Sequence, residues 1–319
     1  MHSSDMVRWG ILGPGFIAGL LMSDAANGRN FRVVATWSRS LPRAQAFAQK
    51  FGIARAYGSY EALLDDRDVD AVYIATPNSL HHQQTMAALA AGKHVLCEKP
   101  YTRRPAEVTE AFDAADAAGL RLMEAFMWRH SPLTLRFAEL LPEIGEVQSI
   151  RSTFGFVIDT TADIRLDPVL DGGSLMDVGC YPVSGSRLVA GAEPVRVYGE
   201  QTVGPSGVDV VFSGILTFPS GLVAEILSGF TFDHRSLEII GSRGTLRLLD
   251  PWNDGGGLEL NGVADPVQLD DAYRLEMENL SDAITGRGQQ LLGRADALGQ
   301  ARTIEALYRS AETGQSVAL

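Results

Sequence analysis

The sequence predicts two domains: an α/β domain built on a parallel sheet, followed by an α+β domain with a large, mostly antiparallel open sheet. The first observation is length, because the chain has 319 residues and a single hydrophobic core usually stops growing at about 250–300. The second is a change of rhythm. Apolar runs alternate with amphipathic segments over residues 1–123, whereas strand-like segments dominate residues 124–319. We therefore expect a domain boundary between residues 123 and 124.

The first domain is expected to contain a doubly wound sheet. Its strands are predicted at VRWGIL, FRVVATW, DAVYIAT, KHVLCE and LRLMEAF. The apolar residues in these runs are consecutive rather than alternating, as expected of parallel strands that helices cover on both faces. The helices LPRAQAFAQKFG and HHQQTMAALAAG lie between strands, and each ends in Gly, the usual C-terminal stop.

The second domain is expected to be a sheet of successive strands closed by two helices. The strands are predicted at EVQSIRSTFGFVI, PVRVYGEQTV, DVVFSGILTF, GLVAEILSGF, SLEIIGS and GTLRLLD, with the turns FPSG and GSRG at hairpin spacing. The helices are predicted at AYRLEMENLSDAITG and RADALGQARTIEALYRSAETG. An antiparallel sheet covered on one side leaves a broad face, which predicts a homodimer or homotetramer.

Composition argues against several classes of function. Lys and Arg total 27 against 39 Asp and Glu, a formal charge of −12, which is the wrong sign for tracking a nucleic-acid backbone. No apolar run reaches the roughly 20 residues that span a bilayer, and the start MHSSDMVRWGILG lacks a signal-peptide pattern. We therefore expect a cytoplasmic protein that binds no membrane. The two cysteines and the adjacent His81 and His82 lack metal-type spacing, so no metal site is expected.

The turn after the first expected strand carries a dinucleotide-binding pattern. Gly13-Pro14-Gly15-Phe16-Ile17-Ala18 matches G-x-G-x-x-A at a strand–helix junction. Gly13 would permit the tight turn, Gly15 would let the backbone approach a pyrophosphate, and Ala18 would keep the helix close to the strand. An ordinary connection is the alternative reading, but the position at the first strand–helix junction favours a Rossmann domain.

The end of the second expected strand favours NADP over NAD. An NAD enzyme would carry Asp or Glu there to hold the ribose 2′-hydroxyl, but this chain has Ser38, followed by Arg39 and by Arg43 one turn on. Two arginines in this place would bind a 2′-phosphate through charged hydrogen bonds. The alternative is that both are solvated arginines at the start of a surface helix, and NAD remains possible.

Two further clusters carry residue types suited to proton transfer. Glu98-Lys99-Pro100 lies at the carboxyl end of the strand HVLC, the edge where open parallel sheets bind ligands. Asp177 and Tyr181 are four residues apart in GGSLMDVGCYP and would share one face of a helix. A Lys beside a Tyr stabilises the phenolate and lowers the pKa of the phenol towards working pH. Taken singly, a surface Lys and a core Tyr remain the alternatives.

Together these motifs resemble the glucose-fructose oxidoreductase / inositol dehydrogenase / rhizopine catabolism (Gfo/Idh/MocA) family over essentially the whole chain. The resemblance also includes the segment from Thr76-Pro77-Asn78 to His81 and the segment MEAFMWR. It implies catalytic roles for Lys99, Asp177 and Tyr181. Tyr181, where inositol dehydrogenase has His, resembles the branch that contains NADP-dependent xylose dehydrogenase and dihydrodiol dehydrogenase.

The resemblance also completes the predicted site. Cofactor contacts are expected from Gly13, Gly15, Phe16, Ile17, Ser38, Arg39, Arg43, Thr76, Pro77, Asn78, His81, Glu98, Lys99, Trp128 and Arg129. Substrate contacts are expected from Lys99, Arg129, Arg165, Asp177 and Tyr181. Glucose-fructose oxidoreductase has an export signal and an N-terminal arm that holds its cofactor; neither is seen in this sequence, so ordinary cofactor exchange is expected.

These residues predict an NADP-dependent oxidoreductase that moves hydride between the nicotinamide and a hydroxyl carbon of a sugar or polyol. Residues 1–123 would bind the dinucleotide, and residues 124–319 would bind substrate and mediate oligomerisation. Two alternatives remain: a ketoreductase that acts on a modified or nucleotide-linked sugar, and a non-catalytic regulator that senses dinucleotides. If Tyr181 is not the proton-transfer group, His130 is the next candidate.

Overall fold

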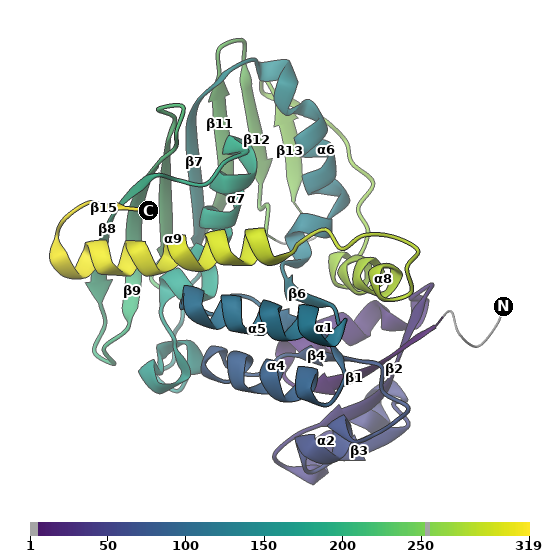
Figure 1. Ribbon diagram of the computed structural model, residues 1–319. Coiled ribbons are helices and arrows are strands. Elements are labelled where there is room, and N and C mark those ends of the chain that lie inside the picture. Colours follow the sequence, from purple (N-terminus) through teal and green to yellow (C-terminus); the bar gives the residue numbers. More distant parts are fainter. Residues whose placement is uncertain (1–5, 253–255) are drawn as a thin grey trace. The chain divides into compact units, whose positions relative to one another are not determined.

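The computed structural model describes residues 6–252 and 256–319, and these form two compact units, each with a sheet of its own (Figure 1). The first unit comprises Met1–Thr102, Ala106–Met127 and Asp271–Ala297. The second comprises Arg103–Pro105, Trp128–Asp270 and Leu298–Leu319. The main transition at Met127 and Trp128 lies close to the break expected after residue 123.

One stretch, residues 271–297, belongs to a different unit from the one that the sequence analysis gave it. Its helix α8 (Ala272–Ile284) packs in the first unit, where Trp9 Nε1 donates to Ser281 Oγ at 3.1 Å. Arg29 Nε also donates to Glu278 Oε2 at 2.9 Å. Helical periodicity shows that a helix has one apolar face, but not which sheet will cover that face.

The sheet of the first unit is parallel throughout, with the strand order β3-β2-β1-β4-β5-β6. Its strands are β1 Val7–Leu12, β2 Phe31–Trp37, β3 Arg55–Tyr57, β4 Ala71–Ile74, β5 His94–Glu98 and β6 Leu122–Ala125. The five expected strands are confirmed, whereas β3 has only three residues and shows no apolar run. The order reverses direction between β1 and β4, and in doubly wound sheets ligands bind outside the carboxyl ends of the strands at such a point.

The helices of the first unit connect these strands. Apart from α8, they are α1 Phe16–Asp24, α2 Leu41–Phe51, α3 Tyr60–Leu64, α4 His81–Ala90 and α5 Pro105–Ala118. Local sequence sets several of their ends. Ser59 caps α3 by accepting from the Ala62 N–H, and Gly52 ends α2 with a left-handed φ of 68°.

The second unit contains a large sheet with the order β14-β13-β12-β11-β7-β10-β9-β8-β15. Its strands are β7 Val147–Gly155, β8 Arg196–Val203, β9 Asp209–Thr217, β10 Val223–Gly229, β11 His234–Gly241, β12 Thr245–Leu249, β13 Gly257–Leu260, β14 Val263–Ala264 and β15 Val317–Ala318. The strand pairs of this sheet within the described residues are antiparallel, except that β10 runs parallel to β7. The expectation of a mostly antiparallel open sheet is confirmed.

Helices α6 (Pro132–Leu140), α7 (Cys180–Ala190) and the second-unit part of α9 (Arg294–Thr313) lie on one face of this sheet (Figure 1). Strand residues facing them are buried, among them Ile150, Phe212, Leu216, Ala224, Ile226, Leu237, Ile239, Leu246 and Leu248. Alternate residues point to the other face, where Ile215, Val223 and Ile240 remain 43%, 40% and 44% exposed. We call this other side the outer face of the sheet.

Candidate active site

The turn between β1 and α1 has the geometry that a pyrophosphate requires. Gly13 has φ +94°, and a Cβ there would lie 2.8 Å from the Ala75 carbonyl oxygen, so only Gly fits. At Gly15 an added Cβ would meet nothing within 4 Å, which leaves open space beside the backbone. Helix α1 begins at the exposed Phe16, followed by the half-buried Ile17, and its first-turn N–H groups have no intrahelical partners.

The carboxyl end of β2 carries no acid. Ser38 directly follows the strand and is buried, and its hydroxyl accepts the Ser40 N–H at 3.3 Å. Arg39 and Arg43, at the start of α2, are exposed and have no ion-pair partner in the part of the chain that the structure describes. Two unpaired guanidinium groups therefore follow the carboxyl end of β2.

A buried histidine, His81, contacts the backbone of the loop that follows β4. Thr76, Pro77 and Asn78 are all half-buried, and the Thr76 hydroxyl donates to Gln84 Oε1 at 2.7 Å. His81, expected to line the cofactor, is 0% exposed. Its Nε2 lies 2.8 Å from the Thr76 carbonyl oxygen and its Nδ1 lies 3.0 Å from the Pro100 carbonyl oxygen.

The turn after β5 presents Lys99. Glu98 is buried, its carboxylate accepts a hydrogen bond from the Tyr73 hydroxyl, and its Oε2 accepts the Lys99 N–H at 3.2 Å. The Lys99–Pro100 peptide bond is cis, and the Lys99 side chain is half-buried. Lys99 therefore lies at the same carboxyl edge of the sheet as the pyrophosphate turn, as the sequence predicts.

In the second unit, Asp177 and Tyr181 lie on a continuous helical segment that is not a regular α-helix. Leu175–Gly179 forms a π-helical turn, and α7 follows from Cys180. The expected i, i+4 spacing is therefore interrupted by a wider turn. Such π turns inside helices occur frequently at functional sites.

A buried carboxylate fixes the start of this segment. Asp209, the first residue of β9, is 3% exposed and accepts from the Ser174 hydroxyl at 2.8 Å and from the Leu175 N–H at 2.7 Å. The Tyr308 hydroxyl donates to its other oxygen at 2.8 Å. Burial raises the pKa of Asp209, although these hydrogen bonds oppose the shift. At Gly173, with φ +121°, a Cβ would lie 2.2 Å from Asp209 Oδ1.

An ion-pair cluster surrounds the Asp177 carboxylate. Arg165 Nε donates to Asp177 Oδ2 at 2.9 Å, and Arg165 Nη1 lies 3.3 Å from Asp163 Oδ1. Burial opposes the charge of Arg165, but the two carboxylates outweigh it and raise the pKa of the guanidinium. Arg165, expected from the resemblance to contact substrate, is thus in direct contact with Asp177.

Aromatic rings pack around Tyr181. The ring lies edge-on to Phe154 with centroids 5.2 Å apart, and it is tilted against Trp252 at 5.7 Å. Trp128 is fully buried and contacts Trp252 edge-on at 5.1 Å. Arg129 is half-buried over the Trp128 ring, and His130 is buried.

The structure thus assembles two half-sites from the predicted residues. The first unit brings together the turns at Gly13, Thr76 and Lys99, and the second brings Arg165 to Asp177 on the segment that carries Tyr181. Since Lys99 and Tyr181 belong to different units, their cooperation stays a prediction. Sequence reasoning missed Asp209, whose signal was only the small residues Gly172, Gly173 and Ser174 before a helix.

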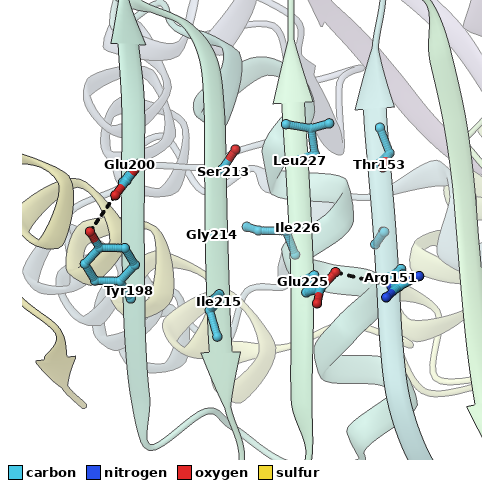
Figure 2. Close-up of a pocket in the computed structure, with 11 residues that line it drawn as sticks. Arg151, Thr153, Tyr198, Glu200, Ser213, Gly214, Ile215, Glu225, Ile226 and Leu227 are labelled. Carbon is cyan, nitrogen blue, oxygen red and sulfur yellow. Dashed lines mark hydrogen bonds and ion pairs between the residues drawn. The ribbon is translucent and has the colours of Figure 1, made fainter.

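Some features lie outside these half-sites. Among residues 6–252 and 256–319, no group of three or more His, Cys, Asp or Glu is placed to hold a metal ion, and no helix there is long and apolar enough to cross a membrane. A groove of about 520 Å³ lies on the outer face, lined by residues of β7, β8, β9 and β10, including Arg151, Tyr198, Ile215 and Leu227 (Figure 2). It shares no residue with the candidate site.

Comparison with known proteins covers both units. The family model "Oxidoreductase family, NAD-binding Rossmann fold" matches residues 7–126, and "GFO/IDH/MocA C-terminal domain" matches residues 142–247. A D-xylose 1-dehydrogenase (NADP(+)) from Haloferax volcanii is 42% identical over 98% of this chain and 100% of its own. A trans-1,2-dihydrobenzene-1,2-diol dehydrogenase from Mus musculus is 34% identical over 77% of this chain and 75% of its own.

A solved structure extends the comparison to three dimensions. The aldose-aldose oxidoreductase from Caulobacter crescentus, complexed with glycerol, superposes with a TM-score of 0.92 at 29% identity. The match covers 98% of this chain and 100% of that one.

Proposed function

Because the chain belongs to the Gfo/Idh/MocA family of oxidoreductases, we propose that it is an NADP-dependent dehydrogenase that moves hydride between the nicotinamide and a hydroxyl carbon of a sugar or diol. The observation that carries the proposal is the pair of half-sites. A lysine turn stands at the carboxyl edge of a Rossmann sheet, and an Asp–Tyr segment is fixed by a buried carboxylate. The names of the xylose and dihydrodiol dehydrogenases support a polyhydroxylated substrate.

The residues of the first unit fit an NADP molecule. The open space at Gly15 and the N-terminus of α1 would take the pyrophosphate, because backbone N–H groups and the helix dipole favour anions there. Arg39 and Arg43 would take the 2′-phosphate, and Ser38 would add no repulsive charge. The loop of Thr76, Pro77 and Asn78 would line the ribose.

The proposed chemistry divides between the cofactor and two side chains. When bound, NADP supplies the redox chemistry by exchanging hydride at C4 of the nicotinamide. In the oxidative direction, the Tyr181 phenol oxygen takes the proton of the substrate hydroxyl, and in the reductive direction it returns that proton. The Lys99 ammonium stabilises the phenolate and donates a hydrogen bond to the reacting oxygen.

Asp177 and Arg165 would orient the substrate rather than transfer protons. Arg165 donates to Asp177 Oδ2 and so restricts the carboxylate to one direction. A carboxylate oriented in this way would accept a hydrogen bond from a sugar hydroxyl. Arg129, which follows Trp128 in the chain, would approach the nicotinamide carboxamide or the substrate. Placing the reacting atoms in this way contributes to the rate without added chemistry.

We also propose a homodimer or homotetramer formed through the outer face of the sheet. That face exposes Ile215 and Val223 on the adjacent strands β9 and β10, and Ile240 on β11 beyond β7. Apolar side chains exposed on an uncovered sheet face favour association. The Arg151–Glu225 ion pair beside the groove, at 3.2 Å, would supply polar contacts within such an interface (Figure 2).

A substrate screen tests the function. The purified protein is mixed with NADP or NAD and a panel of aldoses, polyols and diols, and reduced cofactor is followed by its near-ultraviolet absorbance. Turnover of an aldose or diol with NADP is expected. Reduction of keto sugars by NADPH without oxidation of any hydroxyl would support the ketoreductase alternative. Cofactor binding without turnover of any compound would support the regulator.

A further inference from the structure

Two side chains from other elements contact the backbone directly after Lys99. His81, the first residue of α4, lies within hydrogen-bond distance of the Pro100 carbonyl oxygen. The Tyr101 N–H donates to the carboxylate of Glu124 on β6. Both side chains are buried, at 0% and 4% exposure. Neither contact was anticipated from the sequence, since the residues lie 19 and 23 positions from their partners.

His81 lies between two loops. Its ring stands between the Thr76 carbonyl, in the loop that follows β4, and the Pro100 carbonyl, which follows Lys99. Both partners are acceptors, so a neutral ring with one N–H donates to only one of them at a time. The β4 loop is itself packed against the pyrophosphate turn, where a Cβ on Gly13 would lie 3.0 Å from Thr76 Cγ2. His81 therefore couples the Lys99 turn to the cofactor loops.

Glu124 acts on the other side of Pro100. Its Oε1 accepts the Tyr101 N–H at 2.8 Å, inside the protein. A hydrogen bond from a buried N–H to a carboxylate is stronger than one between neutral groups, and removing the acceptor leaves the N–H unsatisfied. The strand β6 thereby holds the peptide that leaves the Lys99 turn.

We propose that His81 and Glu124 are positioning residues for Lys99: they clamp the backbone on both sides of the Pro100–Tyr101 peptide and thereby set the location of the Lys99 ammonium. This inference rests on the proposed role of Lys99 in catalysis. His81 would act through the Pro100 carbonyl and not by touching cofactor or substrate. A displacement of about 1 Å in a catalytic group costs up to about 100-fold in rate.

The two amides Asn and Gln separate the two contacts of His81. The Asn amide nitrogen lies near the place of imidazole Nδ1, and the Gln amide nitrogen lies near the place of Nε2. His81→Asn keeps the donor to Pro100, whereas His81→Gln keeps only the donor to Thr76. We expect kcat to stay within about 3-fold of the unaltered enzyme for His81→Asn and to fall about 10- to 100-fold for His81→Gln. KM for NADP should change less than 3-fold in both variants, about the effect of losing one weak contact.

Glu124 offers an independent test should the His81 variants fold poorly. Glu124→Gln keeps an oxygen that accepts the Tyr101 N–H and should retain most of kcat. Glu124→Ala removes it and should lower kcat about 10-fold or more, with NADPH binding unchanged in a fluorescence titration. His94→Gln is the matched control: His94 begins β5 at the opposite end of the strand, where its Nδ1 accepts the Arg121 N–H at 2.9 Å. Its kcat should be unchanged.

A Lys99→Ala background separates the catalytic role of Lys99 from the positioning role of His81. If His81 acts through Lys99, adding His81→Gln to Lys99→Ala should lower the residual kcat little further. Normal turnover by Lys99→Ala would refute the role of Lys99 itself. If Lys99→Ala is impaired, equal losses for His81→Asn and His81→Gln, or additive losses in the double variant, would overturn the positioning role.

Discussion

Arg165 holds the Asp177 carboxylate from one side, with its Nε 2.9 Å from Asp177 Oδ2. The same guanidinium contacts Asp163, so one cation neutralises two carboxylates. Removing Arg165 would leave two negative charges close together beside the segment that carries Tyr181. Asp177 would then lose the orientation that a substrate hydroxyl requires.

Arg165→Ala should therefore affect the substrate more than the cofactor. We expect KM for the sugar or diol to rise about 10-fold, equivalent to about 1.4 kcal/mol, with KM for NADP unchanged. Arg165→Lys should recover part of the loss, because it keeps the charge but not the directional Nε donor. Asp177→Asn should be milder than Tyr181→Phe or Lys99→Ala if Asp177 only orients its neighbours. A rise in KM for NADP in steady-state kinetics would contradict this assignment.

Tyr181→Phe tests the proton-transfer group. The substitution keeps the ring that packs against Phe154 and Trp252 and removes only the hydroxyl. Turnover should fall by roughly 10² to 10⁴ while cofactor still binds. Lys99→Ala should be comparably damaging, and the double variant should lose little more, because in the proposed mechanism both residues act on one proton. Near-normal turnover by Tyr181→Phe would point to His130 as the next residue to replace.

Arg39→Ala tests the preference for NADP. If Arg39 binds the 2′-phosphate, its loss should raise KM for NADP about 10-fold and leave KM for NAD nearly unchanged. Arg32, exposed at the opposite end of β2, is the matched control, and Arg32→Ala should change neither value. Equal use of NADP and NAD by the unaltered protein would contradict the predicted preference for NADP.

Asp209 gives a prediction on stability and pH. Asp209→Ala removes the acceptor of three buried donors, of which, among the described residues, only the Ser174 hydroxyl has another partner, Ser228 Oγ at 3.1 Å, and should lower the free energy of unfolding by about 3–5 kcal/mol. Because burial raises the pKa of Asp209, its protonation favours the folded state. That contribution is fully present below the unfolded pKa of about 4 and is lost as the pH rises through the folded value.

Asp209→Asn isolates this charge effect from the hydrogen bonds. Its oxygen can accept from Ser174 and Leu175, and its amide can donate to the Tyr308 oxygen. Relative to the unaltered protein, the variant should gain stability as the pH rises from about 4 to 7. Urea unfolding at several pH values measures the difference. A difference that stays constant over this range would be inconsistent with a raised pKa.

Ile215→Glu tests association through the outer face. A charge at this 43% exposed position beside the groove should dissociate an oligomer that buries it, at a cost of several kcal/mol in an apolar interface. Light scattering should show the variant at the chain mass of 34.4 kDa and the unaltered protein at a multiple of it. Val263→Glu, at an exposed site on the edge strand β14, is the control. An unaltered protein that is monomeric at micromolar concentration would end the proposal.

Local sequence was sufficient to predict the features that local chemistry determines. The Gly13 turn was predictable because a left-handed φ and a close approach to Ala75 require Gly. The five longer parallel strands were predictable because burial on both faces demands continuous apolar runs. Strand β3 was missed because its three residues, Arg55–Tyr57, form no such run.

Features that depend on distant partners were not predictable. Asp209 is an ordinary residue at the start of a strand, and its importance comes from Ser174 and Tyr308, which lie 35 and 99 positions away. The clamp on the Lys99 turn and the placement of α8 in the first unit have the same origin. Periodicity and motif spacing describe neighbours along the chain, whereas these contacts are set by packing.

The parallel pairing of β7 with β10 in the second sheet also has a topological consequence. Parallel neighbours cannot be joined by a hairpin. The chain therefore leaves β7 and crosses the sheet to β8. Strands β9 and β10 then follow, and β10 lies beside β7. That crossing is the segment 156–195, which carries Arg165, Asp177 and Tyr181. Topology thus guarantees a long connection over the covered face, and this connection can change in length and sequence while the strand register stays the same. Divergence of substrate preference among relatives should therefore concentrate in this crossover, with the sheet as the constant frame.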